Sequence, residues 1–275
     1  MSTQIEAWMA YERDQHARWM SAVPAVPMAD VRDLTIADRP ARLYRPPGIG
    51  VPAPVLLYLH GGGWVLGDIA SYDGVARHLA AATSATVLSL DYRRAPEHRH
   101  PAALDDTTNA VAWIADHAAD LGIDPARIGL AGDSAGGHLA AAASLRLAGT
   151  GGPAPAAQIL IYPALDLHEQ AGHPEMLTRV TALYAGDHDR DDPEVSPLAA
   201  PDLSGTPPTI IAAAEHDPIR AQAELFTERL RAAGVPVCHL PGAGLQHGFL
   251  GQLGSLQAAD HYLAGIGAHL KATWM

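Results

Sequence analysis

The chain has 275 residues, of which 48% are hydrophobic and 17% are charged, and its formal net charge at pH 7 is −12. This length is within the range of one α/β domain and allows a sizeable core to be buried. Lys271 is the only lysine and no stretch is rich in arginine, so we expect no nucleic-acid partner. The single cysteine, Cys238, excludes an intrachain disulfide.

The first 20 residues mix charged and apolar side chains, and they lack the apolar core of a secretory signal. No apolar run reaches the roughly 18 residues that are needed to span a bilayer. We therefore expect a soluble, cytoplasmic protein with no membrane partner.

Residues 1–22 have apolar side chains at mixed helical spacing, which predicts an amphipathic helix. Residues 31–45 alternate in polarity, and this pattern predicts one or two antiparallel strands. From Pro54 onward, short apolar strands alternate with helical segments. The predicted strands are Val55–Leu59, Thr86–Leu90, Ile128–Ala131, Gln158–Tyr162, Thr209–Ala214 and Val235–Leu240. The predicted helices are about 72–83, 102–120, 135–147, 219–233 and 256–271. Such a chain predicts one α/β domain over residues 1–275, with a mostly parallel sheet covered by helices on both faces.

Residues 165–207 interrupt this alternation. They are rich in proline, aspartate and histidine, and they contain one weak helical segment at about 174–185. A long insertion between two strands predicts a lid over the C-terminal edge of the sheet, where open α/β proteins bind ligands. The tract Asp187–Asp192 offers carboxylates to a divalent ion, but it lacks the spacing of a calcium loop. We expect a solvated loop and no metal site.

The stretch Gly132-Asp133-Ser134-Ala135-Gly136-Gly137 joins an apolar run to an alanine-rich helical pattern. Strand, glycine turn and helix form the context in which G-x-S-x-G becomes a nucleophile elbow, with the serine Oγ standing clear of the sheet. The pattern alone is weak evidence, because about one such chain in ten would contain it by chance. Ser134 is therefore a candidate nucleophile that needs partners.

A serine nucleophile needs a base, an orienting acid and hydrogen-bond donors for the developing oxyanion. In this kind of fold, the acid and the histidine follow the serine in the chain, each just beyond a strand. Asp217 follows the strand Thr209–Ala214, and His247 lies in a glycine-rich loop after the strand Val235–Leu240. We predict that His247 is the base and that Asp217 orients it.

Other acids and histidines lie near these positions. Glu215 and His216 compete with Asp217, whereas His239 and His261 lie within strand and helix patterns and are expected to be structural.

The segment His60-Gly61-Gly62-Gly63-Trp64 follows the strand Val55–Leu59 directly. Glycines leave backbone N–H groups open to a substrate oxygen, so we predict an oxyanion hole formed by Gly62, Gly63 and Ala135. The apolar side chains next to the catalytic loops are candidate pocket walls, with simple core packing as the alternative. These candidates are Trp64, Val65, Leu66, Leu245, Phe249 and Leu250. The predicted helix over residues 1–22 either packs against the main body or lets Trp8, Trp19 and Met20 help to roof the pocket.

Together these motifs resemble the hormone-sensitive-lipase-like family of α/β-hydrolase carboxylesterases. The resemblance rests on His60-Gly61-Gly62-Gly63, Asp91-Tyr92-Arg93 with Ala95-Pro96-Glu97, the stretch around Ser134, Asp217-Pro218 and His247-Gly248-Phe249. It implies an α/β-hydrolase fold, a serine carboxylesterase that acts on small-molecule esters, and no metal or organic cofactor. It also implies a small cap built from about 1–28 and 165–207, and it leaves a homodimer open.

Three departures from the family pattern stand out. His138 occupies a position where the family often has asparagine, and Ile219–Ala223 lacks the usual acidic residues after the Asp-Pro pair. Both cap segments are short, which favours short acyl chains.

Two alternatives to a carboxylesterase remain. One is another acyl hydrolase on this fold, such as an amidase, peptidase or thioesterase. The other is a non-catalytic ligand-binding receptor of the same family.

Overall fold

The structure is a computed structural model that describes residues 3–168 and 174–274. Residues 1–2, 169–173 and 275 lie outside this description, so a small part of each predicted cap segment is not covered.

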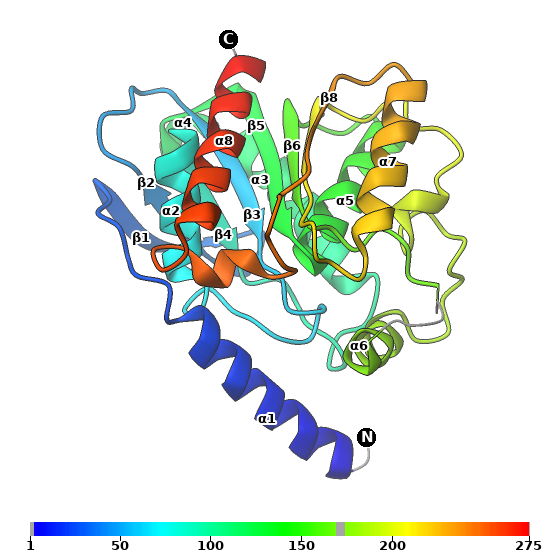
Figure 1. The fold of residues 1–275 in the computed structure, drawn as a ribbon. Helices are drawn as coiled ribbons and strands as arrows, with labels where there is room; N and C mark the ends of the chain where they lie inside the picture. The colour runs from blue at the N-terminus through cyan, green and yellow to red at the C-terminus, as the bar shows by residue number, and fades with distance from the viewer. Residues whose placement is uncertain (1–2, 169–173, 275) are drawn as a thin grey trace.

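In the described residues, the strands form a single eight-stranded sheet (Figure 1). Its strands are β1 (Asp30–Ile36), β2 (Arg39–Arg45), β3 (Ala53–Leu59), β4 (Thr86–Leu90), β5 (Ile123–Asp133), β6 (Ala157–Ile161), β7 (Thr209–Ala212) and β8 (Val237–Leu240). Their order across the sheet is β1-β2-β4-β3-β5-β6-β7-β8. β2 pairs antiparallel with both β1 and β4, and all other neighbouring strands are parallel. The mostly parallel sheet predicted from the sequence is confirmed.

Helices cover both faces of this sheet. The α-helices of the described residues are α1 (Thr3–Met20), α2 (Asp73–Thr83), α3 (Ala102–Asp116), α4 (Ala118–Leu121), α5 (Ala135–Thr150), α6 (Glu175–Ala185), α7 (Arg220–Ala232) and α8 (Gln257–Thr273). α2 and α8 pack against one face, and α3, α5 and α7 pack against the other. The segment predicted as one helix over 102–120 is divided at His117, where the backbone leaves helical geometry.

The central strand β3 is a continuous apolar run because it is buried on both faces of the sheet. Val55, Leu57 and Leu59 belong to the core on the α3, α5 and α7 side, whereas Leu56 and Tyr58 belong to the core under α2 and α8. All five side chains are fully buried, and each aliphatic one contributes roughly 1.5–3 kcal/mol of burial free energy. The strand is thereby fixed from both faces, and its C-terminal end carries the triple-glycine loop.

α1 and α6 both lie at the lower edge of the molecule in Figure 1, away from the two helical layers. Arg179 of α6 places its guanidinium 4.7 Å from the centre of the Trp8 ring of α1, so the two helices are in contact. They lie where the sequence predicts a cap. None of the helices in residues 3–168 and 174–274 has both the length and the apolar composition that a bilayer crossing requires.

Candidate active site

Ser134 is the single residue between β5 and α5. Its backbone has φ 51° and ψ −114°, a strained combination for a residue with a Cβ, and its N–H donates to the Ile161 carbonyl at 2.8 Å. The flanking glycines permit the close approach. A Cβ on Gly136 would lie 1.8 Å from the Leu59 carbonyl oxygen, and one on Gly132 would lie 2.3 Å from the backbone of Gly136. This is the geometry predicted for a nucleophile elbow.

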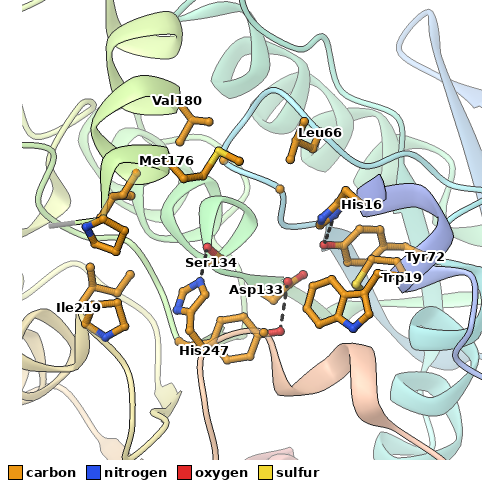
Figure 2. A pocket seen from close by; sticks show the side chains of 18 residues that line it. His16, Trp19, Leu66, Tyr72, Asp133, Ser134, Met176, Val180, Ile219 and His247 are labelled. Atoms are coloured by element: carbon orange, nitrogen blue, oxygen red, sulfur yellow. Dashed lines mark hydrogen bonds between the residues drawn. The ribbon is translucent and has the colours of Figure 1, made fainter. Parts of the chain in front are cut away.

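The loops after β7 and β8 bring the predicted acid and base to this serine. His247 Nε2 lies 3.0 Å from Ser134 Oγ (Figure 2), and His247 Nδ1 lies 2.8 Å from Asp217 Oδ2. The other Asp217 oxygen accepts a hydrogen bond from the Ile219 N–H at 2.9 Å, and the Asp217 side chain is only 1% exposed. With its proton on Nδ1, the imidazole presents an Nε2 lone pair to the serine hydroxyl.

Glu215 and His216, the two residues that compete with Asp217 in the sequence, lie outside this chain of hydrogen bonds. Glu215 accepts a hydrogen bond from the Gly244 N–H at 2.7 Å, and the His216 backbone pairs with the segment that carries Leu245 and Gln246. Both residues therefore hold the loop that carries His247. His239 and His261 lie on β8 and α8.

The predicted oxyanion loop follows β3. Gly62 has φ +105° and Gly63 has φ +60°, and a Cβ on Gly62 would lie 2.7 Å from the Leu66 carbonyl oxygen. Both positions therefore require glycine. Within the described part of the chain, no residue accepts a hydrogen bond from the N–H of Gly62, Gly63 or Ala135. These donors are open to a substrate oxygen.

Asp133 ties the oxyanion loop to the nucleophile turn. Its buried carboxylate accepts hydrogen bonds from the Tyr58 hydroxyl at 2.6 Å and the Gly61 N–H at 2.9 Å, and the Tyr162 hydroxyl lies 3.3 Å away. Burial raises the pKa of Asp133 to about 6, against the opposing effect of these hydrogen bonds. Asp133 thus holds the loop after β3 against the turn at Ser134.

His60 supports the same loop from inside the core. Its Nδ1 lies 2.9 Å from the Gly61 carbonyl oxygen, and its ring stacks on Tyr92 at 4.4 Å. Burial lowers the pKa of His60 to about 3, so the ring is neutral at physiological pH.

A cavity of about 390 Å³ opens in front of Ser134 (Figure 2). This volume is near the lower end of the range for small-molecule sites, roughly 300–1,000 Å³. One half is lined by side chains from α1 and from the residue that precedes α2, namely His16, Trp19, Met20 and Tyr72. The other half is lined by apolar side chains around α6 and the loop after Asp217, namely Pro174, Met176, Leu177, Val180, Pro218 and Ile219. Leu66, in the loop between β3 and α2, completes the lining.

Only one of the six predicted wall residues, Leu66, lines this cavity. The prediction is wrong in placement for the other five, which are at most 2% exposed and pack in the core: Trp64, Val65, Leu245, Phe249 and Leu250. Of the predicted roof residues, Trp19 and Met20 line the cavity, whereas Trp8 packs against α6. Sequence reasoning missed the α6 side chains and the His16–Tyr72 pair.

His138, the first departure from the family pattern, is fully buried on α5. Its Nδ1 accepts a hydrogen bond from the Trp64 indole N–H at 3.1 Å, and its Nε2 lies 3.0 Å from the Val195 carbonyl oxygen. Burial lowers the pKa of His138 to about 3, so the ring is neutral, with its proton on the Nε2 that faces Val195.

The second departure is the lack of acidic residues in Ile219–Ala223, where Gln222 of α7 supplies a polar side chain instead. Its side-chain oxygen accepts hydrogen bonds from the N–H groups of Leu165 at 2.8 Å and Asp166 at 3.1 Å. An amide therefore anchors the start of the segment 165–207 to α7. In the tract Asp187–Asp192 and elsewhere in the described ranges, no three His, Cys, Asp or Glu side chains converge as a metal site would require.

Known proteins resemble this chain in both sequence and structure. A family model for the alpha/beta hydrolase fold matches residues 56–251. The chain is 41% identical over 268 residues to the carboxylic ester hydrolase LipN of Mycobacterium tuberculosis, which covers 88% of this chain and 71% of that protein. It is 36% identical over 267 residues to an arylesterase of Saccharolobus solfataricus, with 91% and 86% covered. The structure of a hyperthermophilic esterase from the archaeon Pyrobaculum calidifontis superposes with a TM-score of 0.90 at 33% identity, covering 97% of this chain and 94% of that one. The chain therefore belongs to the α/β-hydrolase family, in the hormone-sensitive-lipase-like group of carboxylesterases that its motifs resemble.

Proposed function

We propose that Ser134, His247 and Asp217 hydrolyse short-chain carboxylic esters of small molecules through an acyl-enzyme intermediate. The class of activity, carboxylic ester hydrolysis by a serine enzyme, is that of the group to which the chain belongs. The observation that carries the assignment of residues is the unbroken series of hydrogen bonds from Asp217 through His247 to Ser134, at the floor of the cavity.

In the first half of the reaction, His247 Nε2 takes the proton of Ser134 Oγ as that oxygen attacks the ester carbonyl carbon. The negative charge on the former carbonyl oxygen is stabilised by the N–H groups of Gly62, Gly63 and Ala135. The tetrahedral intermediate collapses, the bond to the alcohol oxygen breaks, and His247 gives its proton to that oxygen. The alcohol leaves, and the acyl group stays on Ser134.

In the second half, His247 takes a proton from water, and the resulting hydroxide attacks the acyl carbon. Collapse of the second tetrahedral intermediate returns the proton to Ser134 Oγ and releases the carboxylic acid. Asp217 keeps the proton of the resting imidazole on Nδ1 and stabilises the imidazolium that forms in each half-reaction. Replacing Asp217 by asparagine would keep the shape of the side chain and remove its negative charge.

The variant Asp217→Asn tests the assignment of the acid. We expect its kcat on a chromogenic acetate ester to fall about 10⁴-fold, whereas Asp202→Asn, which alters an exposed aspartate, should retain wild-type activity. Equal kcat values for the two variants would remove Asp217 from the proposed triad.

Substrate size and bond type are further parts of the proposal. The small cavity supports short acyl chains, so kcat/KM for an acetate or butyrate ester should exceed that for a decanoate ester of the same alcohol. The alternative activities, amidase, peptidase and thioesterase, are distinguished by measuring kcat/KM for one acyl group presented as an ester, an amide and a thioester. A higher kcat/KM for the amide or the thioester would replace the esterase assignment, and binding of all three without turnover would favour the receptor.

The proposal also includes α1 and α6 acting as a small cap, a cytoplasmic location and the option of a homodimer. A single cysteine is compatible with a reducing compartment, and β8 is an edge strand of the sheet to which a second copy could add. Light scattering at several protein concentrations gives the oligomeric state.

A further inference from the structure

The two halves of the cavity differ in chemistry. Around α6 the lining is hydrocarbon and thioether, with Met176, Leu177 and Val180 as its main side chains. On the α1 side, two polar groups interrupt the apolar lining, the His16 imidazole and the Tyr72 hydroxyl. His16 Nε2 lies 3.2 Å from the hydroxyl oxygen of Tyr72. Figure 2 shows both side chains on the side of Ser134 opposite Ile219. The mechanism proposed above uses neither of them.

This pair is held in place from several directions. Tyr72 is 1% exposed and directly precedes α2, and its ring lies 5.3 Å from that of His60. The His16 ring packs edge-on against Trp19 at 5.9 Å. Two residues that are distant in the sequence thus meet at one wall of the cavity, on supports that fix their orientation.

The hydrogen-bonding capacity of the pair follows from its protonation. Burial lowers the pKa of His16 to about 4, so the ring is neutral at physiological pH, with one N–H donor and one acceptor nitrogen. If Tyr72 donates to His16 Nε2, the His16 Nδ1–H remains a donor and the phenol oxygen an acceptor. If His16 donates, the phenol O–H and the His16 Nδ1 lone pair remain. In both arrangements the pair retains one donor and one acceptor, which are the two functions of a hydroxyl group.

We propose that the α1 half of the cavity binds a hydroxyl-bearing arm of the substrate, while the α6 half takes a hydrocarbon arm. The preferred substrates are then small esters with one hydroxylated side and one hydrocarbon side, namely hydroxyalkyl esters or esters of hydroxy acids. His16 and Tyr72 are the residues that determine this specificity. The inference rests on the proposed ester hydrolysis at Ser134.

Two pairs of esters of equal size test the inference. They also show whether the hydroxyl-bearing arm belongs to the alcohol or to the acyl side of the ester. Propyl butyrate and 2-hydroxyethyl butyrate differ by CH₃ against OH in the alcohol arm, and ethyl butyrate and ethyl 3-hydroxypropanoate differ in the same way in the acyl arm. The readout is the ratio of kcat/KM for the hydroxylated ester to that for its hydrocarbon partner. Comparing this ratio between enzyme variants cancels the intrinsic reactivity of each ester.

We expect Tyr72→Phe and His16→Leu each to lower the ratio about fivefold or more in one of the two pairs, since each removes a hydrogen bond to the substrate hydroxyl. His16→Gln retains a donor and an acceptor and should restore part of the ratio. Met176→Leu, in the α6 half, should change both members of each pair alike and leave the ratios as in the wild type. If Tyr72→Phe does not fold, His16→Leu on α1 gives the same comparison.

Ratios that stay within about twofold of the wild type in both pairs, for an enzyme that hydrolyses the hydrocarbon esters, would overturn this inference and leave the proposed function intact. Failure of the wild type to hydrolyse any of the four esters would instead count against the proposed function.

Discussion

Trp64 donates its indole N–H to Nδ1 of His138 at 3.1 Å, and this bond joins the residue after the oxyanion loop to the helix that begins at the nucleophile. The Trp64 ring also stacks on Tyr184 of α6 at 4.6 Å, and His138 bonds the Val195 carbonyl with its other nitrogen. The two halves of the proposed catalytic machinery and the neighbouring helix α6 therefore share one buried aromatic cluster.

Replacing His138 by leucine keeps an apolar volume but leaves the Trp64 N–H and the Val195 carbonyl without their partner. An unsatisfied buried polar group costs about 1–3 kcal/mol, so we expect His138→Leu to lower the free energy of unfolding by about 2–4 kcal/mol. Urea denaturation measures this, with the exposed His261→Leu as the matched control. An unfolding midpoint for His138→Leu equal to that of the control would show that the bond contributes no stability.

Arg13 connects α1 to the body of the enzyme. Its guanidinium donates to the carbonyls of Val65 and Ala95 at 3.0 and 3.2 Å and to both carboxylate oxygens of Glu97 at 2.8 Å. We expect Arg13→Leu to loosen the α1 wall of the cavity and raise KM about tenfold, with a smaller change in kcat, because the triad is untouched. Arg18→Leu on the same helix is the control, since Arg18 is 74% exposed and pairs with Asp14 one turn earlier. Equal KM values in the two variants would contradict this anchoring role.

The oxyanion loop offers a test through its backbone. An alanine Cβ at Gly62 would meet the Leu66 carbonyl at 2.7 Å, at a φ of +105° that disfavours any L side chain. The loop must therefore shift, and displacement of one oxyanion donor typically lowers kcat about 10²–10³-fold. Gly149→Ala is the control because nothing lies within 4 Å of its new Cβ. Wild-type kcat in Gly62→Ala would argue that this loop does not hold the oxyanion.

Buried histidines should make the fold sensitive to acid. Burial lowers the pKa of His60 and His138 to about 3 and that of His16 to about 4, whereas a histidine in an unfolded chain has a pKa of about 6.5. As the pH falls below about 6.5, the unfolded chain binds these protons and the folded chain does not. Their contribution to stability is full above that pH and is lost as the pH falls toward 4, by up to about 1.4 kcal/mol per pH unit for each histidine.

Asp133 acts in the opposite direction. Its pKa of about 6 in the fold lies above the ordinary aspartate pKa of 3.8, so its contribution to stability is present in acid and is lost as the pH rises through 6. With three histidines against one aspartate, stability should fall between pH 6.5 and 5. Urea titrations at pH 7, 6 and 5 measure the slope, and His138→Asn should reduce it by about one proton. Parallel slopes in the wild type and His138→Asn would refute the assignment for that residue.

The sequence predicts the triad because its members lie at strand ends. In a parallel sheet the carboxyl ends of the strands meet at one edge, so Ser134 after β5, Asp217 after β7 and His247 after β8 come together once the strands are recognised. The glycine loop after β3 is predicted for the same reason. None of these placements depends on how a helix is oriented against its neighbours.

The pocket walls depend on orientations that local sequence does not carry. Trp64 follows the glycine loop with φ +61°, and its indole bonds His138 in the core instead of facing the cavity. Phe249 and Leu250 follow Gly248 into a short 3-10 turn under α8. His16 reaches the cavity because the long-range bonds of Arg13 place α1 over it. These are tertiary effects, and they are why five of the six predicted wall residues lie in the core.

The central claim is that ester hydrolysis proceeds through an acyl group on Ser134. Mass spectrometry of the protein after inactivation by a fluorophosphonate tests this most directly, because the reagent captures an activated serine as a stable phosphonyl adduct. We expect one adduct per chain, located on the peptide that contains Ser134, with loss of esterase activity in proportion to labelling and no adduct in Ser134→Ala. An adduct on another residue, or undiminished ester hydrolysis by Ser134→Ala, would contradict the account.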